Sequence, residues 1–299
     1  GDAVVLLAED EMNRGQQQLA TSQPESVAIA LMHSYCNPTH EQQLARVLPK
    51  EKFPYVSVSS QLSPSQKIVP RASTALVNAY LAPIIHHYLY RIGKQVPDGS
   101  LKVMSSAGGL ADANLFQPKD SLLSGPAGGV VGAVSVLKQV QSQFPDFQRL
   151  LSLDMGGTST DVSRYDEEYD YQYVTKVGDA EITSPALAIE TVAAGGGSIC
   201  QYKNGALAVG PESAGAYPGP ACYGQGGPLT ITDVNLLLGR LREDKFGIPI
   251  NRDHAQRALD NIKENMPDAS DISDEALLAG FLQIANEKMT EAVRSISVQ

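Results

Sequence analysis

The sequence predicts an α/β protein with a parallel sheet, and three observations support this prediction. Residues 27–33 form an apolar run that predicts a buried strand, and residues 39–48 have a capped helical pattern. Residues 55–59 then alternate in polarity, as a strand does. A strand, a helix and a second strand in this order form a β-α-β unit, whose two strands run parallel.

A long helix is predicted after this unit, because apolar residues recur at helical spacing between residues 71 and 96. The residues that carry the pattern are Leu76, Tyr80, Ile84, Tyr88 and Ile92. Short strands are predicted at residues 101–105 and 150–154, and a helix rich in small side chains at residues 124–140.

The second half of the chain is predicted to start with strands and to end with helices. Asn204-Gly205 stands between two apolar stretches and is typical of a tight hairpin turn. Residues 211–228 are dense in glycine and proline and predict a long loop. Thr232 and Asp233 can cap a helix that runs to residue 241. Two further helices are predicted at residues 252–265 and 274–297.

Composition and charge exclude some classes of partner. The chain has 299 residues and a formal net charge of −10. An acidic surface is a poor electrostatic partner for nucleic acid or for an anionic membrane, so neither is expected as a partner. No apolar run approaches the roughly 18–20 residues that span a bilayer, so no transmembrane helix is predicted. Cys36, Cys200 and Cys222 are scattered, and reduced thiols in a cytoplasmic protein are the simplest interpretation.

Both ends of the sequence have the pattern of an interrupted element. Residues 1–7 resemble the middle of an element, and the last predicted helix reaches residue 299 without a capping glycine. The sequence is therefore expected to be a piece of a longer protein.

The clearest chemical motif is an apolar strand that ends at Asp154 and is followed by Gly156, Gly157, Thr158, Ser159, Thr160 and Asp161. Two glycines allow a tight turn whose backbone can approach a ligand closely. A strand-turn-strand hairpin of this kind can present N–H groups to a phosphate and carboxylates to its Mg²⁺. An ordinary β-turn is the alternative. We expect Gly156 or Gly157 to adopt a conformation that is costly for other residues.

Two further glycine-rich segments have both a functional and a structural interpretation. Gly125 and Gly128 lie at the start of the small-residue helix, where a helix N-terminus can hold an anion. Close packing between helices explains the same residues. Gly195, Gly196 and Gly197 end a predicted strand. Three consecutive glycines weaken a strand, so a ligand loop is favoured over a linker.

The loop over residues 211–228 contains Glu212 and Cys222, which raises the question of a nucleophile or an acid-base pair. No histidine lies nearby in the sequence to activate Cys222. A buried thiol that holds the loop is the alternative, and the sequence favours it. We also expect this loop to lie near residues 195–197.

The order of these motifs resembles the actin, Hsp70 and sugar-kinase superfamily, and within it the hydantoinase A/5-oxoprolinase family. The matching strings extend from about Ser26 to Leu241 and are HSYCNPTHE, MSSAGGL, SGPAGGVVGA, LDMGGTSTDVS, TVAAGGGSI, VGPESAGAYPGPACY and LTITDVNLLLGRL. The resemblance implies a ribonuclease-H-like ATPase fold with two partial lobes. Residues 1–143 would be the end of the first lobe with its connecting helices, and residues 144–299 a second lobe that is truncated at its C-terminus.

The resemblance also implies a reaction, namely the ATP-dependent hydrolysis of a cyclic amide of the hydantoin or 5-oxoproline type. The cofactors implied are ATP and Mg²⁺, and the partner implied is a hydantoinase B-like subunit or domain. Asp154 and Asp161 would orient Mg²⁺ or water, with a catalytic role. Gly156, Gly157 and Thr158 would hold phosphate with help from Thr160. Gly125, Gly128 and residues 195–197 are further candidates for nucleotide contacts.

Two motifs of the family are missing from the sequence, the first phosphate motif and the glycine-rich adenosine motif. The isolated chain is therefore expected to bind ATP weakly and to be inactive, since each tenfold loss of affinity needs only about 1.4 kcal/mol. Three alternatives remain open, which are the ATP-using subunit of a ketone carboxylase of the acetone or acetophenone type, an Hsp70-like ATP-driven binding module, and a sugar or acetate kinase.

Overall fold

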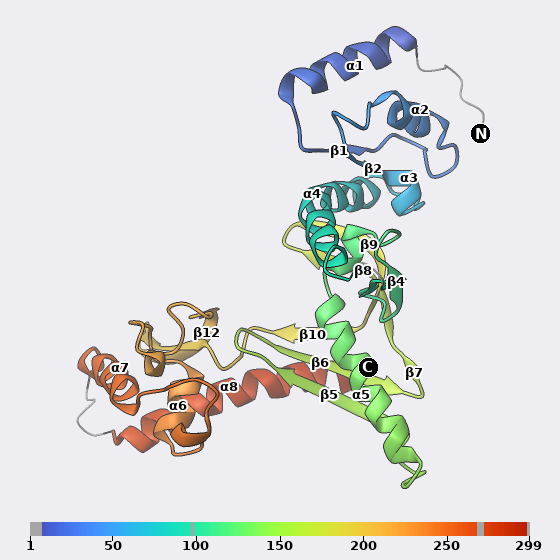
Figure 1. Ribbon diagram of the computed structural model, residues 1–299. Coiled ribbons are helices and arrows are strands. Elements are labelled where there is room, and N and C mark those ends of the chain that lie inside the picture. The colour runs from blue at the N-terminus through green and yellow to red at the C-terminus, as the bar shows by residue number, and fades with distance from the viewer. Residues whose placement is uncertain (1–7, 97–98, 268–271, 298–299) are drawn as a thin grey trace. The chain divides into compact units, whose positions relative to one another are not determined.

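A computed structural model describes residues 8–96, 99–267 and 272–297 of the chain (Figure 1). The expectation for residues 1–7 lies outside this part. The chain forms two compact units, each considered by itself. The first unit contains the residues up to Ser135 and the segment Tyr169–Ala188. The second unit contains Val136–Glu168 and the residues from Ile189 onward. The division into lobes at residues 143 and 144 stays a prediction.

The first unit confirms the predicted β-α-β order. Strands β1 (Ser26–Ile29) and β2 (Tyr55–Val58) pair in parallel, and α2 (Thr39–Val47) connects them. The other elements of this unit are α1 (Glu9–Ser22), α3 (Ser59–Leu62), α4 (Ile68–Gly93), β3 (Lys102–Met104), β4 (Leu110–Asp112), η1 (Pro118–Ser121), the first part of α5 (Ser124–Gln141), β8 (Tyr171–Val177) and β9 (Ala180–Leu187).

A buried carboxylate fixes the loops that follow β1 and β2. Glu41 of α2 is fully buried and accepts hydrogen bonds from the backbone of Leu31 and Ser60 and from the hydroxyls of Ser34 and Ser59. Burial by itself would raise the pKa of Glu41, but these hydrogen bonds hold its pKa below the usual value. The last residue of the HSYCNPTHE string is therefore a structural anchor.

Helix α4 buries a side other than the one that its apolar pattern marks. Its buried residues include the small side chains Ala75, Ala79 and Ala82, whereas Leu76, Tyr80, Ile84 and Tyr88 are exposed. By length and composition alone α4 could cross a membrane, although core helices of soluble proteins pass the same test. Length and composition therefore do not support the prediction that the chain has no transmembrane helix.

The second unit is built around an antiparallel sheet with the strand order β10-β6-β5, in which β7 also pairs with β6. It confirms the predicted strand-rich region and the Asn204-Gly205 turn, where both residues have positive φ angles of 55° and 82°. Its elements are β5 (Arg149–Met155), β6 (Thr160–Asp166), β7 (Glu168–Tyr169, whose last residue belongs to the first unit), β10 (Ile189–Val192), β11 (Ser198–Lys203), β12 (Ala206–Ser213), η2 (Ala221–Tyr223), α6 (Ile231–Leu237), η3 (Glu243–Lys245), α7 (Arg252–Glu264) and α8 (Asp274–Ser297).

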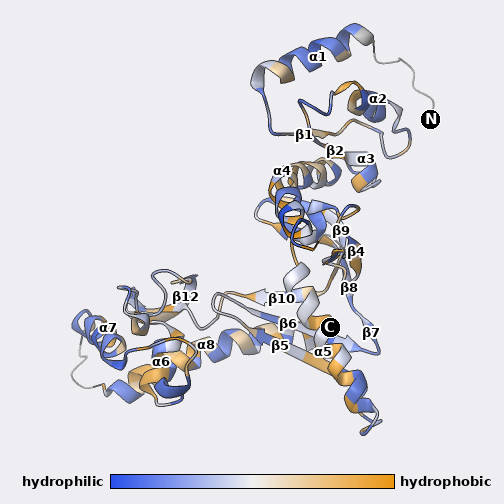
Figure 2. Cartoon of the chain, viewed as in Figure 1, coloured by the Kyte–Doolittle hydropathy of each residue, from blue (hydrophilic) through white to orange (hydrophobic). Residues whose placement is uncertain are grey.

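The core of the second unit lies among α6, α7 and α8. Figure 2 shows hydrophobic colour on α6, and Val234 and Leu236 of this helix are fully buried. The predicted cap at Thr232 and Asp233 needs correction, because the N-cap is Thr230, with Asp233 in the third helical position of a capping box. The helix also ends earlier than predicted, at Leu237, and Gly239 follows with a positive φ of 74°.

Candidate phosphate-binding hairpin

The segment with two aspartates and two glycines forms the predicted strand-turn-strand hairpin. Strands β5 and β6 pair antiparallel, with Asp154 opposite Asp161 and Met155 opposite Thr160. The Gly156 N–H donates to the Ser159 carbonyl at 2.9 Å and closes the turn. Directly opposite residues on an antiparallel pair project from the same face, with Cβ atoms about 4.5–5.5 Å apart. The two carboxylates are therefore close enough to act on one ligand.

The turn rests on the three glycines of residues 195–197 through direct backbone contacts. The Gly196 and Gly197 N–H groups donate to the carbonyls of Gly156 and Gly157 at 3.0 and 2.6 Å. A Cβ at Gly195 would lie 2.7 Å from the Gly156 oxygen, and one at Gly197 would lie 2.9 Å from the Gly157 oxygen. Side chains at these positions would push the turn away.

This contact corrects the prediction that Gly156 or Gly157 holds a costly conformation. Neither residue is among the positive-φ glycines, and a Cβ on Gly157 would have no heavy atom within 4 Å. The steric need for glycine thus lies at Gly195 and Gly197. Gly156, Gly157 and Thr158 remain exposed at the tip of the hairpin, where a ligand can reach their peptide groups.

The hydroxyl groups of two threonines hold the hairpin through hydrogen bonds. Thr160 is fully buried and its hydroxyl donates to the Ala194 carbonyl at 2.5 Å. The Thr191 hydroxyl of β10 donates to Asp161 Oδ1 at 2.6 Å. Thr160 therefore holds the turn in place, and Thr191 orients the carboxylate. Sequence reasoning missed Thr191, because only the strand register shows that it lies opposite Asp161.

The carboxylates fit a magnesium ion that keeps several water ligands. Among the described residues no group of three or more His, Cys, Asp or Glu side chains could hold a metal by itself. Mg²⁺ in phosphate sites commonly uses only one or two carboxylates, with phosphate oxygens and water as the other ligands. Asp161 has one oxygen bound by Thr191, and its other oxygen and the exposed Asp154 satisfy this smaller requirement.

The glycine- and proline-rich loop contacts the same glycine segment, as predicted. The Ala214 N–H and the Ser213 hydroxyl both donate to the Gly197 carbonyl, at 2.9 and 3.2 Å. On the other side, the Thr232 hydroxyl and N–H donate to the Gly196 carbonyl. The carbonyls of residues 196 and 197 are thus tied to the loop and to α6.

Asp233 holds the loop together from inside the core. It is fully buried, and its carboxylate accepts from the N–H groups of Ala221, Cys222 and Thr230 and from the Thr230 hydroxyl, at 2.7–3.0 Å. The loop that carries Cys222 is therefore fixed to the start of α6. The exposed Glu212 lies at the end of β12, away from this anchor in the sequence.

Cys222 has the properties of a structural thiol. Burial raises the pKa of Cys200 and of Cys222, and the negative charge of Asp233 raises both pKa values further. A thiol needs to ionise before it can act as a nucleophile, so neither side chain is suited to that role.

We expect iodoacetamide at pH 8 to alkylate the exposed Cys36 and to leave Cys200 and Cys222 unmodified until the protein unfolds. Peptide mass spectrometry before and after addition of urea measures this directly. Alkylation of Cys222 in the native protein at the rate of Cys36 would contradict the structural role.

Gly125 and Gly128 belong to the first unit, in the first turns of α5. A Cβ on Gly125 would have no heavy atom within 4 Å, and one on Gly128 would lie 3.9 Å from a Met104 side-chain atom. Within the described residues, close packing therefore does not explain these two glycines. Their part in a nucleotide site stays a prediction.

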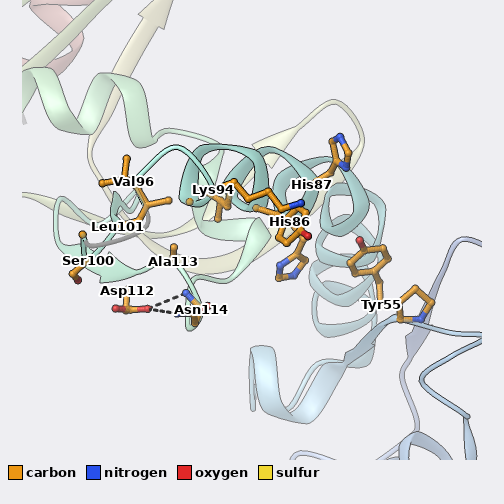
Figure 3. A pocket seen from close by; sticks show the side chains of 15 residues that line it. Tyr55, His86, His87, Lys94, Val96, Ser100, Leu101, Asp112, Ala113 and Asn114 are labelled. Atoms are coloured by element: carbon orange, nitrogen blue, oxygen red, sulfur yellow. Dashed lines mark hydrogen bonds between the residues drawn. The ribbon is translucent and has the colours of Figure 1, made fainter.

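Two cavities accompany these elements. One of about 400 Å³ lies in the second unit between β10 and α8, and Thr191 and Lys288 line it. Another of about 830 Å³ lies in the first unit, where the rings of Tyr55 and His86 stack with centroids 5.4 Å apart (Figure 3). Burial lowers the pKa of His86, so its ring is neutral at pH 7. Neither cavity is predicted from the sequence.

The chain is similar to known proteins in sequence and in structure. The chain is 40% identical to a 5-oxoprolinase of Pestalotiopsis fici over 99% of its length, and it spans 24% of that protein. The structure of an ATP-dependent caprolactamase from Pseudomonas jessenii matches all of the chain with a TM-score of 0.76 and 31% identity, over 44% of that protein. A nucleotide-free acetone carboxylase matches 98% of the chain with a TM-score of 0.79 and 26% identity, over 42% of that protein.

The family profile described as Hydantoinase/oxoprolinase matches residues 71–299, which include the hairpin, the three glycines and the loop. The match covers most of the chain, so the chain belongs to the hydantoinase/oxoprolinase family.

Proposed function

We propose that this chain is part of the ATP-using portion of an enzyme that hydrolyses a cyclic amide of the 5-oxoproline or hydantoin type. The observation that carries the proposal is the exposed tip at residues 156–158, held from behind by backbone contacts with residues 195–197. The tip occurs in a chain that is similar to a 5-oxoprolinase and to an ATP-dependent caprolactamase. We further propose that the fold is a pair of partial ribonuclease-H-like lobes.

Different residues of the hairpin would contact the phosphates of ATP and the cation bound to them. The N–H groups at the exposed tip would donate to phosphate oxygens, and Asp154 and Asp161 would face the cation that accompanies them. Magnesium, when bound, neutralises the charge that develops on the phosphates. The Thr191 hydroxyl keeps the Asp161 carboxylate in one orientation, so little reorganisation is needed during the reaction.

The chemistry proposed is transfer of the γ-phosphoryl group of ATP to the amide oxygen, with ADP as the leaving group. The bond from phosphorus to the ADP oxygen breaks as the bond to the amide oxygen forms. Water adds to the activated carbonyl carbon, and the bond from this carbon to the ring nitrogen breaks as the nitrogen takes up a proton. A second water hydrolyses the resulting acyl phosphate, which releases phosphate and leaves the ring-opened product. We propose that a hydantoinase B-like subunit or domain carries the hydrolytic step and that the enzyme is cytoplasmic.

One alternative has a specific observation in its favour. The structural similarity to an acetone carboxylase fits an ATP-using subunit of a ketone carboxylase. The same hairpin would serve both reactions, because each begins with phosphate held against a carbonyl compound. The hairpin therefore supports ATP use without distinguishing the second substrate.

An assay on the full-length protein tests the proposal. We expect 5-oxoproline or a hydantoin to stimulate phosphate release from Mg·ATP, with one ring-opened product formed for each phosphate. Stimulation by a small ketone with bicarbonate, and by no cyclic amide, would support the alternative. Phosphate release that no such compound stimulates would overturn both.

A further inference from the structure

One side of α4 exposes a row of large apolar side chains. Leu76, Tyr80, Ile84 and Tyr88 are 64%, 74%, 63% and 60% exposed. They follow one another at intervals of four residues, which places them along one side of the helix over about 18 Å. We call these four residues the α4 stripe.

The α4 stripe is unusual for a surface that faces water. No charged residue occurs between Arg71 and Arg91, whereas a solvated helix side normally carries charges. Helix α7 shows the ordinary pattern, since its exposed residues include Arg252, Asp253 and Asp260. Contiguous exposed apolar patches of more than a few hundred Å² usually mark interaction sites.

The opposite side of α4 favours a protein partner over a lipid bilayer. Arg71 is fully buried and donates to the Ser59 hydroxyl and the Leu31 carbonyl, at 3.0 and 2.5 Å. Asn78 donates to the Ser57 hydroxyl at 2.9 Å. These polar bonds fix α4 to β1, β2 and their loops as a helix of a folded unit. The stripe lies on the part of α4 that the described residues of the first unit leave exposed.

The length of the relatives indicates what covers the stripe. The chain spans 24% of the 5-oxoprolinase that it resembles and less than half of the two solved structures. In the described part of the first unit the parallel sheet has two strands, β1 and β2, whereas parallel sheets normally have more strands and both faces covered. Both facts point to more polypeptide around this unit.

We propose that the α4 stripe packs against a helix of the same polypeptide, contributed by residues outside 1–299. A row of side chains at four-residue intervals is the ridge that fits a groove on a second helix. Tyrosines in the stripe can bury their rings while each hydroxyl finds a partner at the rim. This inference concerns packing of the first unit and does not depend on the proposed reaction.

Site-specific photocrosslinking in the full-length protein tests the proposal. p-Benzoylphenylalanine replaces Tyr80, and Tyr217, which is 81% exposed on the loop of the second unit, receives the same substitution as a control. At nanomolar protein concentration we expect position 80 to crosslink within one chain, to a segment outside residues 1–299. The crosslink should persist unchanged on tenfold dilution.

The other outcomes identify other occupants and overturn the proposal. Crosslinks between two copies that disappear on dilution would show self-association. Crosslinks that need an added partner subunit would show a subunit interface, and crosslinks to lipid in phosphatidylcholine–phosphatidylglycerol vesicles would show a membrane surface. A natural protein that contains nothing beyond residues 1–299, or a position 80 that crosslinks no more than the urea-unfolded control, would also overturn it.

A substitution provides an independent measurement. Ile84→Asn in the full-length protein is expected to lower the urea midpoint, because it buries an amide in the proposed helix contact. Ile248→Asn, on a residue that is 47% exposed in the second unit, is the matched control and should leave the midpoint unchanged. Equal midpoints for the two variants would contradict a covered stripe.

Discussion

Gly195→Ala is expected to destabilise the second unit by about 3 kcal/mol, the upper range for an overpacked site. The added methyl group would lie 2.7 Å from the Gly156 oxygen and 2.8 Å from the Gly157 carbonyl carbon and the Ser159 nitrogen. All three are backbone atoms, which cannot turn aside as a flexible side chain can. The turn would have to leave its support, and ATP hydrolysis by the full-length protein should fall with it.

Gly157→Ala is the matched control for this prediction. The same methyl group would meet no heavy atom within 4 Å, so the free energy of unfolding should change by less than about 0.5 kcal/mol. Urea denaturation of both variants, followed by circular dichroism, makes the comparison. If Gly195→Ala unfolds at the midpoint of the Gly157→Ala variant, the backbone contact between the two segments is wrong.

Asp154→Asn and Asp161→Asn should each lower kcat for ATP hydrolysis in the full-length protein by about 10²–10³-fold, the range for loss of one preorganised electrostatic group. Asparagine has the shape of aspartate, and at position 161 its oxygen can still accept from the Thr191 hydroxyl. The fold should therefore remain, while the negative charge that attracts the cation is lost.

The dependence of the rate on Mg²⁺ concentration separates this role from a structural one. Both variants should need more Mg²⁺ for half-maximal activity, with an unchanged urea midpoint. Asp179→Asn removes an exposed carboxylate at the turn between β8 and β9 and serves as the control. Activity within twofold of the unsubstituted protein for both site variants would remove the hairpin from the catalytic machinery.

The hairpin could be predicted from the sequence because its signals are local. A strand, two glycines and a returning strand occupy adjacent residues, and the turn has little choice of geometry. The steric role of Gly195 could not be predicted in the same way. It arises from contact with residues nearly forty positions earlier in the chain, and three consecutive glycines do not indicate which one meets a neighbour.

Helix α4 shows a second limit of sequence reasoning. The periodicity of Leu76, Tyr80, Ile84 and Tyr88 correctly predicts a helix, because it reflects helical geometry. It does not say which side the first unit itself covers. Here alanines and hydrogen-bonded polar residues pack inward, and only the contacts made in the folded unit distinguish the two sides of the helix.

The departure of Tyr169–Ala188 from the second unit into the first has a consequence for synthesis on the ribosome. The Thr183 N–H donates to the Thr74 hydroxyl, and the Lys119 ammonium donates to the Ser184 hydroxyl, so β9 completes packing that begins more than a hundred residues earlier. At about 5–20 residues per second, residues 136–188 take roughly 3–10 s to be translated. During that interval β9 is absent and the side of α4 that it covers stays exposed in the nascent first unit. We therefore expect a ribosome-associated chaperone to bind the first unit at this stage.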